Sequence, residues 1–99
     1  MINLKSGKNG EGKTEYYLNE LDTYESFDRV VTEVIKSGPS LLDQVDGIYF
    51  RIALFSISGK KFKIIFHEDV GTYAFSIKEE ENEDWLIKVL ENLIENLNT

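Results

Sequence analysis

Apolar and polar residues alternate at the start of the chain, with the period of two that is typical of a β-strand. Ile2 and Leu4 lie on one face of this pattern, and residues 16–18 (Tyr-Tyr-Leu) have high β-propensity. Residues 6–13 contain three glycines, and the pair Asn9-Gly10 favours the positive φ angles of a tight turn. The pattern predicts an N-terminal β-hairpin.

The spacing of apolar residues then changes to three and four, which is typical of an α-helix with one buried face. Asp22 is the expected N-cap, with Glu25 three residues later in the capping-box position. Gly38-Pro39 should end the helix, because proline cannot continue its hydrogen-bond ladder. The predicted apolar stripe consists of Tyr24, Phe27, Val30, Val31, Val34 and Ile35.

The segment 41–45 (Leu-Leu-Asp-Gln-Val) is ambiguous from its sequence. It can form a short strand that joins the next one through Asp46-Gly47, a good pair for a two-residue turn. It can equally form one helical turn capped by Ser40. The sequence leaves both alternatives open.

Three predicted strands follow. Residues 48–57 are apolar on both faces except at Arg51, which favours a central strand. Residues 61–67 and 72–78 alternate, and their connections are too short for parallel crossovers, so the three strands should form an antiparallel meander. We expect the helices to cover the sheet face that carries Phe62, Ile64, Phe66, Tyr73, Phe75 and Ile77.

A second amphipathic helix closes the chain, with Asn82 as its expected cap and a spine formed by Leu86, Leu90, Leu93 and Leu97. The predicted fold class is α+β, in a single domain spanning residues 1–99. Its expected order is an N-terminal β-hairpin, a helix, a three-stranded antiparallel meander and a C-terminal helix. The result is a two-layer sandwich with both helices on one sheet face.

The composition excludes several classes of protein and of functional site. The 99 residues are 41% hydrophobic and 12% aromatic, which favours a folded domain over a disordered chain. The absence of cysteine excludes disulfides and thiolate sites, and a single histidine excludes a multi-histidine metal cluster. No apolar run approaches the ~20 residues of a membrane span, and the first residues lack the apolar core of a secretory signal. We therefore expect a cytoplasmic protein without a cofactor.

Residues 7–14 (Gly-Lys-Asn-Gly-Glu-Gly-Lys-Thr) match the phosphate-loop pattern G-x-x-x-x-G-K-[ST]. A phosphate loop joins a buried parallel strand to a helix whose N-terminus faces the anion. Here the aromatic pair Tyr16-Tyr17 follows and indicates an extended strand instead. The sequence favours a glycine-rich hairpin tip, and nucleotide binding or a small enzyme that uses this segment remains the alternative.

The segment His67-Glu68-Asp69 joins an imidazole to two carboxylates at a strand end. General acid–base catalysis requires a nearby nucleophile or water, and a metal site requires a further ligand such as Asp43 or Asp46. Adjacent strand residues point to opposite faces and cannot all converge on one ion. We interpret the segment as a polar turn and expect no enzymatic activity.

Charge is distributed unevenly along the chain, whose formal net charge is −7. Residues 79–99 hold seven acids against one lysine, a net charge of −6, and residues 11–28 hold six acids against one lysine, a net charge of −5. Residues 48–78 hold five basic residues against two acids, a net charge of +3. Acidic helices beside a mildly basic sheet steer basic partners towards the protein and repel nucleic acid.

The sheet itself offers a weaker alternative, a platform for single-stranded nucleic acid built from stacking aromatic rings and cations. We expect nucleic-acid binding less than protein binding, because the global charge opposes it. The residues of this platform would be Tyr49, Phe55, Arg51, Lys61, Lys63, His67 and Lys78.

From Asp46-Gly47 to Leu97 the chain resembles small bacterial immunity proteins of toxin–immunity pairs. The resemblance rests on those two residues, the strand through Arg51, the segments 59–62 and 67–71, and the acidic triplet 79–81 before the last helix. It implies a short, acidic, non-enzymatic protein that neutralises a toxin by occluding its active site. Phage-encoded inhibitors of host defence nucleases share this composition and remain an alternative.

The expected function is a stoichiometric inhibitor that docks an acidic surface into a basic cleft of a toxin or nuclease domain. We expect a monomer or homodimer that binds no membrane. A further alternative is a self-associating structural protein that pairs through the unguarded edge at residues 41–45. The predicted partner-binding residues are Glu68, Asp69, Glu79, Glu80, Glu81, Glu83 and Asp84.

Overall fold

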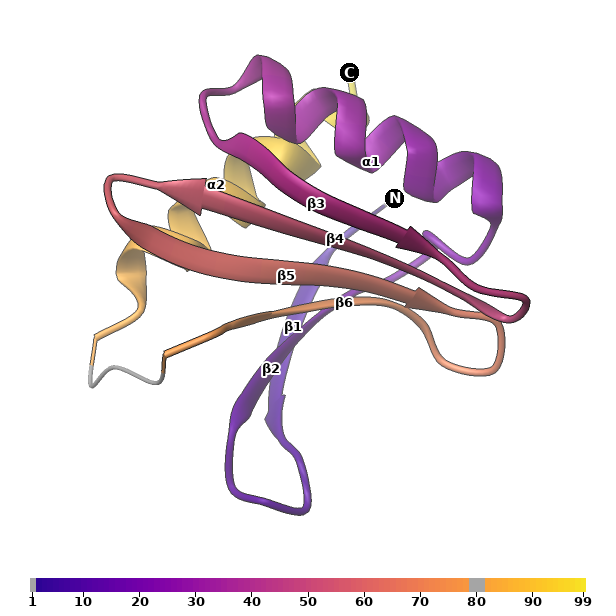
Figure 1. The fold of residues 1–99 in the computed structure, drawn as a ribbon, viewed down its shortest axis with the longest axis horizontal. Coiled ribbons are helices and arrows are strands. Elements are labelled where there is room, and N and C mark those ends of the chain that lie inside the picture. The colour runs from indigo at the N-terminus through magenta and orange to yellow at the C-terminus, as the bar shows by residue number, and fades with distance from the viewer. Residues whose placement is uncertain (1, 79–81) are drawn as a thin grey trace.

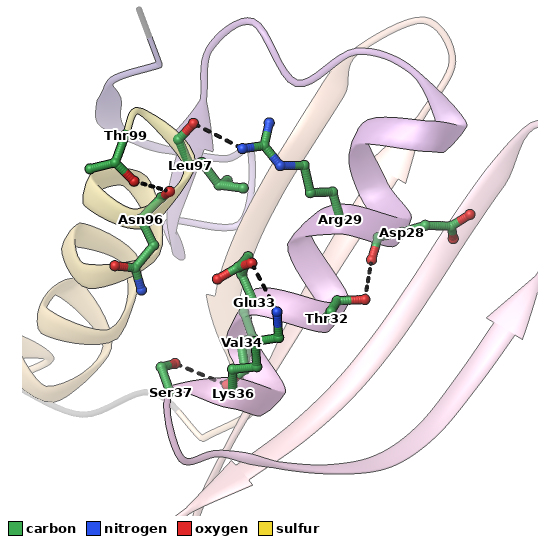
Figure 2. A network of polar contacts seen from close by, with 10 residues as sticks. All are labelled: Asp28, Arg29, Thr32, Glu33, Val34, Lys36, Ser37, Asn96, Leu97 and Thr99. Atoms are coloured by element: carbon green, nitrogen blue, oxygen red, sulfur yellow. Dashed lines mark hydrogen bonds and ion pairs between the residues drawn. The ribbon is translucent and has the colours of Figure 1, made fainter.

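The computed structural model describes residues 2–78 and 82–99. It is an α+β fold in which a six-stranded antiparallel sheet, of order β1-β2-β6-β5-β4-β3, carries two helices (Figure 1). The elements in chain order are β1 (Leu4–Lys8), β2 (Thr14–Leu18), α1 (Tyr24–Lys36), β3 (Ser40–Asp46), β4 (Phe50–Ile57), β5 (Lys60–His67), β6 (Gly71–Ser76) and α2 (Asp84–Leu97).

The N-terminal hairpin is confirmed, but the meander has four strands where the sequence predicted three. Residues 40–46 form β3, which pairs with β4 at the edge of the sheet and has a bulge between Leu41 and Asp43. Residues 47–49 form the connection to β4, so this strand starts at Phe50 and not at Ile48. Pairing with β4 decides between the strand and the helical turn that the sequence left open.

One core lies between the two helices and one face of the sheet. Phe62, at its centre, is fully buried; its ring stacks on Phe55 at 5.3 Å and meets Trp85 edge-on at 6.1 Å between ring centroids. The apolar stripe of α1 is confirmed except at Ile35, which is 46% exposed. The spine of α2 is buried as predicted, and its members are Leu86, Leu90, Leu93 and Leu97.

The two helix caps differ from the prediction. Thr23, not Asp22, caps α1: its hydroxyl accepts from the Ser26 N–H at 3.0 Å, and the Ser26 hydroxyl accepts from the Thr23 N–H at 3.1 Å. This is a capping box shifted one residue along the chain and built from two hydroxyls. Glu83 is the N-cap of α2, while the expected cap, Asn82, accepts the Asp84 N–H at 2.9 Å.

The predicted side-chain directions on β6 are wrong. Phe62, Ile64 and Phe66 face the helices as expected, but their partners on β6 are Ser76, Ala74 and Thr72. Tyr73 and Phe75 therefore lie on the opposite face, which no helix of the described residues covers. We refer to this second face as the open face.

A three-residue turn between β5 and β6 is the reason for these side-chain directions. The His67 carbonyl accepts from the Val70 N–H at 3.0 Å, and Gly71, with φ 96°, pairs with His67. A turn of this length with a left-handed glycine is a common hairpin connection. The sequence pattern assigned Gly71 to the turn, whereas in the structure Gly71 is the first residue of β6. This shift of one residue moves every side chain of β6 to the other face of the sheet.

Gly71→Ala is expected to lower the free energy of unfolding by about 1–2 kcal/mol, because a Cβ is disfavoured at positive φ. A Cβ there meets only the Leu21 carbonyl, at 4.0 Å, so the loss reflects backbone conformation and not a clash. The matched control is Gly10→Ala, where the φ is not positive and no atom lies within 4 Å. Urea unfolding measures both, and equal losses would contradict the turn described here.

Candidate protein-binding surface

The structure separates the predicted partner-binding residues into two groups. Glu68 and Asp69 lie in the β5–β6 turn, beside the His67–Gly71 pair. Glu83 and Asp84 lie at the start of α2, near the opposite end of β6, as Figure 1 shows. Residues 79–81, the predicted Glu79, Glu80 and Glu81, fall outside the described residues. The four described carboxylates therefore do not form one cluster.

Glu83 is engaged within the protein. Its carboxylate accepts hydrogen bonds from the Tyr16 hydroxyl, at 2.9 Å, and from the Ser76 hydroxyl. Burial first, and then the hydrogen bond to this carboxylate, raise the pKa of Tyr16 to about 12. Glu83 thus ties the start of α2 to the buried face of β2 and β6, whereas Asp84 is exposed.

At the other end of the sheet, three connections lie together: residues 19–23, 47–49 and 68–70. We call this region the loop end. It holds the three most exposed large hydrophobic residues that the structure describes: Ile48 at 81%, Tyr49 at 63% and Val70 at 60%. Apolar side chains this exposed, gathered at one end of a small domain, are typical of a contact site for another molecule.

Hydrogen bonds hold the loop end in place. The Glu68 N–H donates to the Tyr49 carbonyl at 3.0 Å, which joins the β3–β4 and β5–β6 turns. The Tyr24 hydroxyl, from the first turn of α1, donates to the Ile48 carbonyl at 2.9 Å. The Arg51 guanidinium lies over the Tyr24 ring, 4.4 Å from its centroid. The exposed apolar side chains therefore project from a fixed backbone.

Carboxylates surround these apolar residues, and they belong to Glu20, Asp22, Asp46, Glu68 and Asp69. Asp46 pairs with Arg51 at 3.4 Å. Asp69 donates its backbone N–H to His67 Nδ1 at 3.1 Å, which directs the backbone and not the carboxylate towards the imidazole. A depression of about 370 Å³ is lined by Tyr49, His67, Glu68 and Asp69. The loop end combines an apolar centre with an acidic rim.

A second depression at this end, of about 330 Å³, lies between the β2–α1 connection and the β5–β6 turn. Its lining includes Glu20, Asp22 and Val70, together with Lys5 from β1. In the part of the chain that the structure describes, no three histidine, aspartate or glutamate side chains are placed to hold a metal ion.

The segment 7–14 is an antiparallel hairpin. Lys8 pairs with Thr14, which lies in β2, and no helix follows directly. The side-chain carbonyl of Asn9 accepts from the N–H groups of Glu11 and Lys13, at 2.9 and 3.1 Å. Two backbone donors that a phosphate would require are thus used within the turn.

The predicted nucleic-acid platform is divided between the two sheet faces. Phe55 is fully buried beneath the helices, and Arg51 lies on the same face against Tyr24. Lys61 and Lys63 are on the open face, where Tyr17, Tyr73 and Phe75 lie close to one another and Phe50 lies beside His67. The apolar and polar pattern did not predict this aromatic group, and the signal for it was Gly71 as a strand residue.

Comparison with known proteins identifies no relative: no family model, curated protein or solved structure matches the chain. Among the described residues, neither helix is long and apolar enough to cross a membrane.

Proposed function

We propose that the chain is a non-enzymatic protein-binding module, a stoichiometric inhibitor that docks an acidic surface into a basic cleft of a toxin or nuclease domain. The loop end supports this proposal best. It presents Ile48, Tyr49 and Val70 as apolar anchors within a rim that includes Glu68 and Asp69. An apolar or aromatic centre with a polar rim is typical of protein–protein interfaces.

Two physical effects contribute to binding at this surface, one to association and one to dissociation. The carboxylates attract a basic partner over distance and raise the association rate. The apolar anchors then lose their contact with water and slow dissociation. The connections at the loop end are already fixed by the bonds of Glu68 and Tyr24, so little conformational freedom is lost on binding.

Glu68 and Asp69 are the members of the predicted set that this surface contains. Glu83 is already bound to Tyr16 and Ser76, so we assign it to the helix–sheet contact. Asp84 lies at the other end of the molecule and can touch only a partner that also covers that side. Glu79, Glu80 and Glu81 remain predicted contacts outside the described residues.

The test uses the proteins whose genes lie next to the gene for this chain, since immunity proteins are encoded beside their toxins. Each is expressed and its binding is measured by surface plasmon resonance at low and high salt. We expect one basic partner whose association slows at high salt. The Glu68→Lys/Asp69→Lys variant should reduce the association rate by about tenfold or more, and Tyr49→Ala should mainly raise the dissociation rate.

The matched control is Glu91→Lys/Glu95→Lys, which makes the same change in net charge on the exposed side of α2. It should slow association much less than the loop-end variant. Equal slowing by both variants would show that only net charge matters and would contradict the loop end as the contact. A neighbouring toxin that the wild-type chain neither binds nor neutralises in cells would contradict the function itself.

A further inference from the structure

The open face carries a row of apolar side chains that crosses five adjacent strands. Hydrogen-bonded register places these residues side by side: Tyr17 on β2, Tyr73 on β6, Ile65 on β5, Ile52 on β4 and Val45 on β3. The solvated face of an antiparallel sheet is normally polar. A continuous apolar row on it indicates that another surface covers it.

Aromatic contacts reinforce this row. The rings of Tyr17 and Tyr73 lie 5.9 Å apart, and Phe75 stacks on Tyr73 with centroids 6.3 Å apart. All three side chains are partly exposed, although they shield one another. Phe75 extends the patch towards the far end of β6, so the patch lies along the middle of the sheet.

The charges beside Phe75 are opposite in sign. Lys63 pairs with Phe75 on one side, and Glu15, one residue before the Tyr16–Ala74 pair, lies on the other. Glu15 accepts a hydrogen bond from the Tyr17 hydroxyl at 2.7 Å, which holds it on the open face. The complete charged set in the strands of this face is Lys5, Lys61 and Lys63 against Glu15 and Asp43. The face is close to neutral in a chain of net charge −7.

We propose that a second copy of this chain covers the open face, packed sheet on sheet about a two-fold axis that runs along β6. Such an axis exchanges β2 and β5, the two neighbours of β6. It places Lys63 of each copy opposite Glu15 of the other, with Tyr73 and Phe75 meeting their own counterparts on the axis. The face is thus complementary to itself in charge and in apolar character, as a two-fold interface requires.

The size of the face sets the strength of this dimer. Six strands spaced ~4.8 Å apart and about 20 Å long bury roughly 500 Å² in each copy. The total of about 1,000 Å² is at the lower limit for a specific interface. An interface of this size is typical of weak or transient complexes. It is formed by the strands of the open face and not by the three connections of the loop end, so it goes beyond the proposed function and does not depend on it.

A charge exchange between copies tests the two-fold arrangement. Lys63→Glu places two glutamates opposite each other at each symmetric contact, and Glu15→Lys places two lysines there. Each variant alone should raise the dissociation constant of its homodimer by about tenfold or more. Mixed in equal amounts, the two variants should form a heterodimer, because both contacts then pair a lysine with a glutamate. Sedimentation equilibrium from ~1 µM to ~1 mM measures this.

Three results would overturn the proposal. The first is a wild-type monomer up to ~1 mM. The second is a dimer that both variants form as well as the wild type, which would indicate pairing through another surface such as the β3 edge. The third is a monomer whose open face binds single-stranded nucleic acid, detected with a fluorescent oligonucleotide and abolished by Phe75→Ala. Circular dichroism shows that each variant is folded. The binding test with the neighbouring toxin gives a separate result for the loop end.

Discussion

Replacing Phe62 with alanine is expected to lower the free energy of unfolding by about 3–5 kcal/mol. The side chain is fully buried and contacts the rings of Phe55 and Trp85, so its removal leaves a cavity between the sheet and α2. Domains of this size are stable by only about 5–15 kcal/mol, and the variant should be close to unfolding at 37 °C. Urea denaturation followed by circular dichroism measures the loss.

Phe75→Ala is the matched control, because it makes the same change on the neighbouring strand but on the open face. We expect it to lower the free energy of unfolding by about 1 kcal/mol or less, since its side chain is partly exposed and neither helix of the described residues covers it. The measurement is made at a protein concentration below that at which the proposed dimer would form. Similar losses for the two variants would mean that Phe75 lies in the core, as the sequence pattern predicted.

Tyr16→Phe is expected to lower the free energy of unfolding by about 1–2 kcal/mol. It removes the hydrogen bond from the hydroxyl to the Glu83 carboxylate, and hydrogen bonds to charged groups are the stronger class. Ser76 remains a donor to that carboxylate, which limits the loss. A double-mutant cycle with Glu83→Ala, which removes the acceptor, isolates this contact, and a coupling energy near zero would contradict the role that we assign to Glu83.

The same contact makes a prediction about pH. The pKa of Tyr16 is about 12 in the folded protein and about 10 in the unfolded chain, so folding favours the protonated phenol. Its stabilising effect is fully present below pH 10 and is lost as the pH rises through 12. After allowance for solvent near the hydroxyl, we expect this loss to be about 1 kcal/mol.

The difference between wild type and Tyr16→Phe isolates this effect. This comparison is needed because two other tyrosines also have raised pKa values. The hydrogen bond to Glu15 raises the pKa of Tyr17, and burial raises the pKa of Tyr73. The stability difference should be constant from pH 7 to 9 and should shrink above pH 10. A difference that does not change up to pH 12 would contradict the raised pKa.

The candidate site was only partly visible in the sequence. Glu68 and Asp69 follow a strand with clear alternation, and a polar turn there was predictable. That Ile48 and Tyr49 lie beside this turn was not, because the bond from the Glu68 N–H to the Tyr49 carbonyl joins residues 19 positions apart. Likewise, the acidic residues before α2 suggested a binding surface. In the structure, however, the Glu83 carboxylate accepts hydrogen bonds from the Tyr16 and Ser76 hydroxyls.

The sequence by itself determined the local elements: the hairpin around Asn9, both helices, and the strands of the meander from residue 50 onward. These follow from patterns with periods of 2 and 3.6 and from turn residues, which act over a few positions. Tertiary structure decided the rest. Pairing with β4 made residues 40–46 a strand, and the three-residue turn that precedes Gly71 set the register that turns Tyr73 and Phe75 away from the helices. Both strands are apolar enough to fit either arrangement, so only contacts between distant segments could choose.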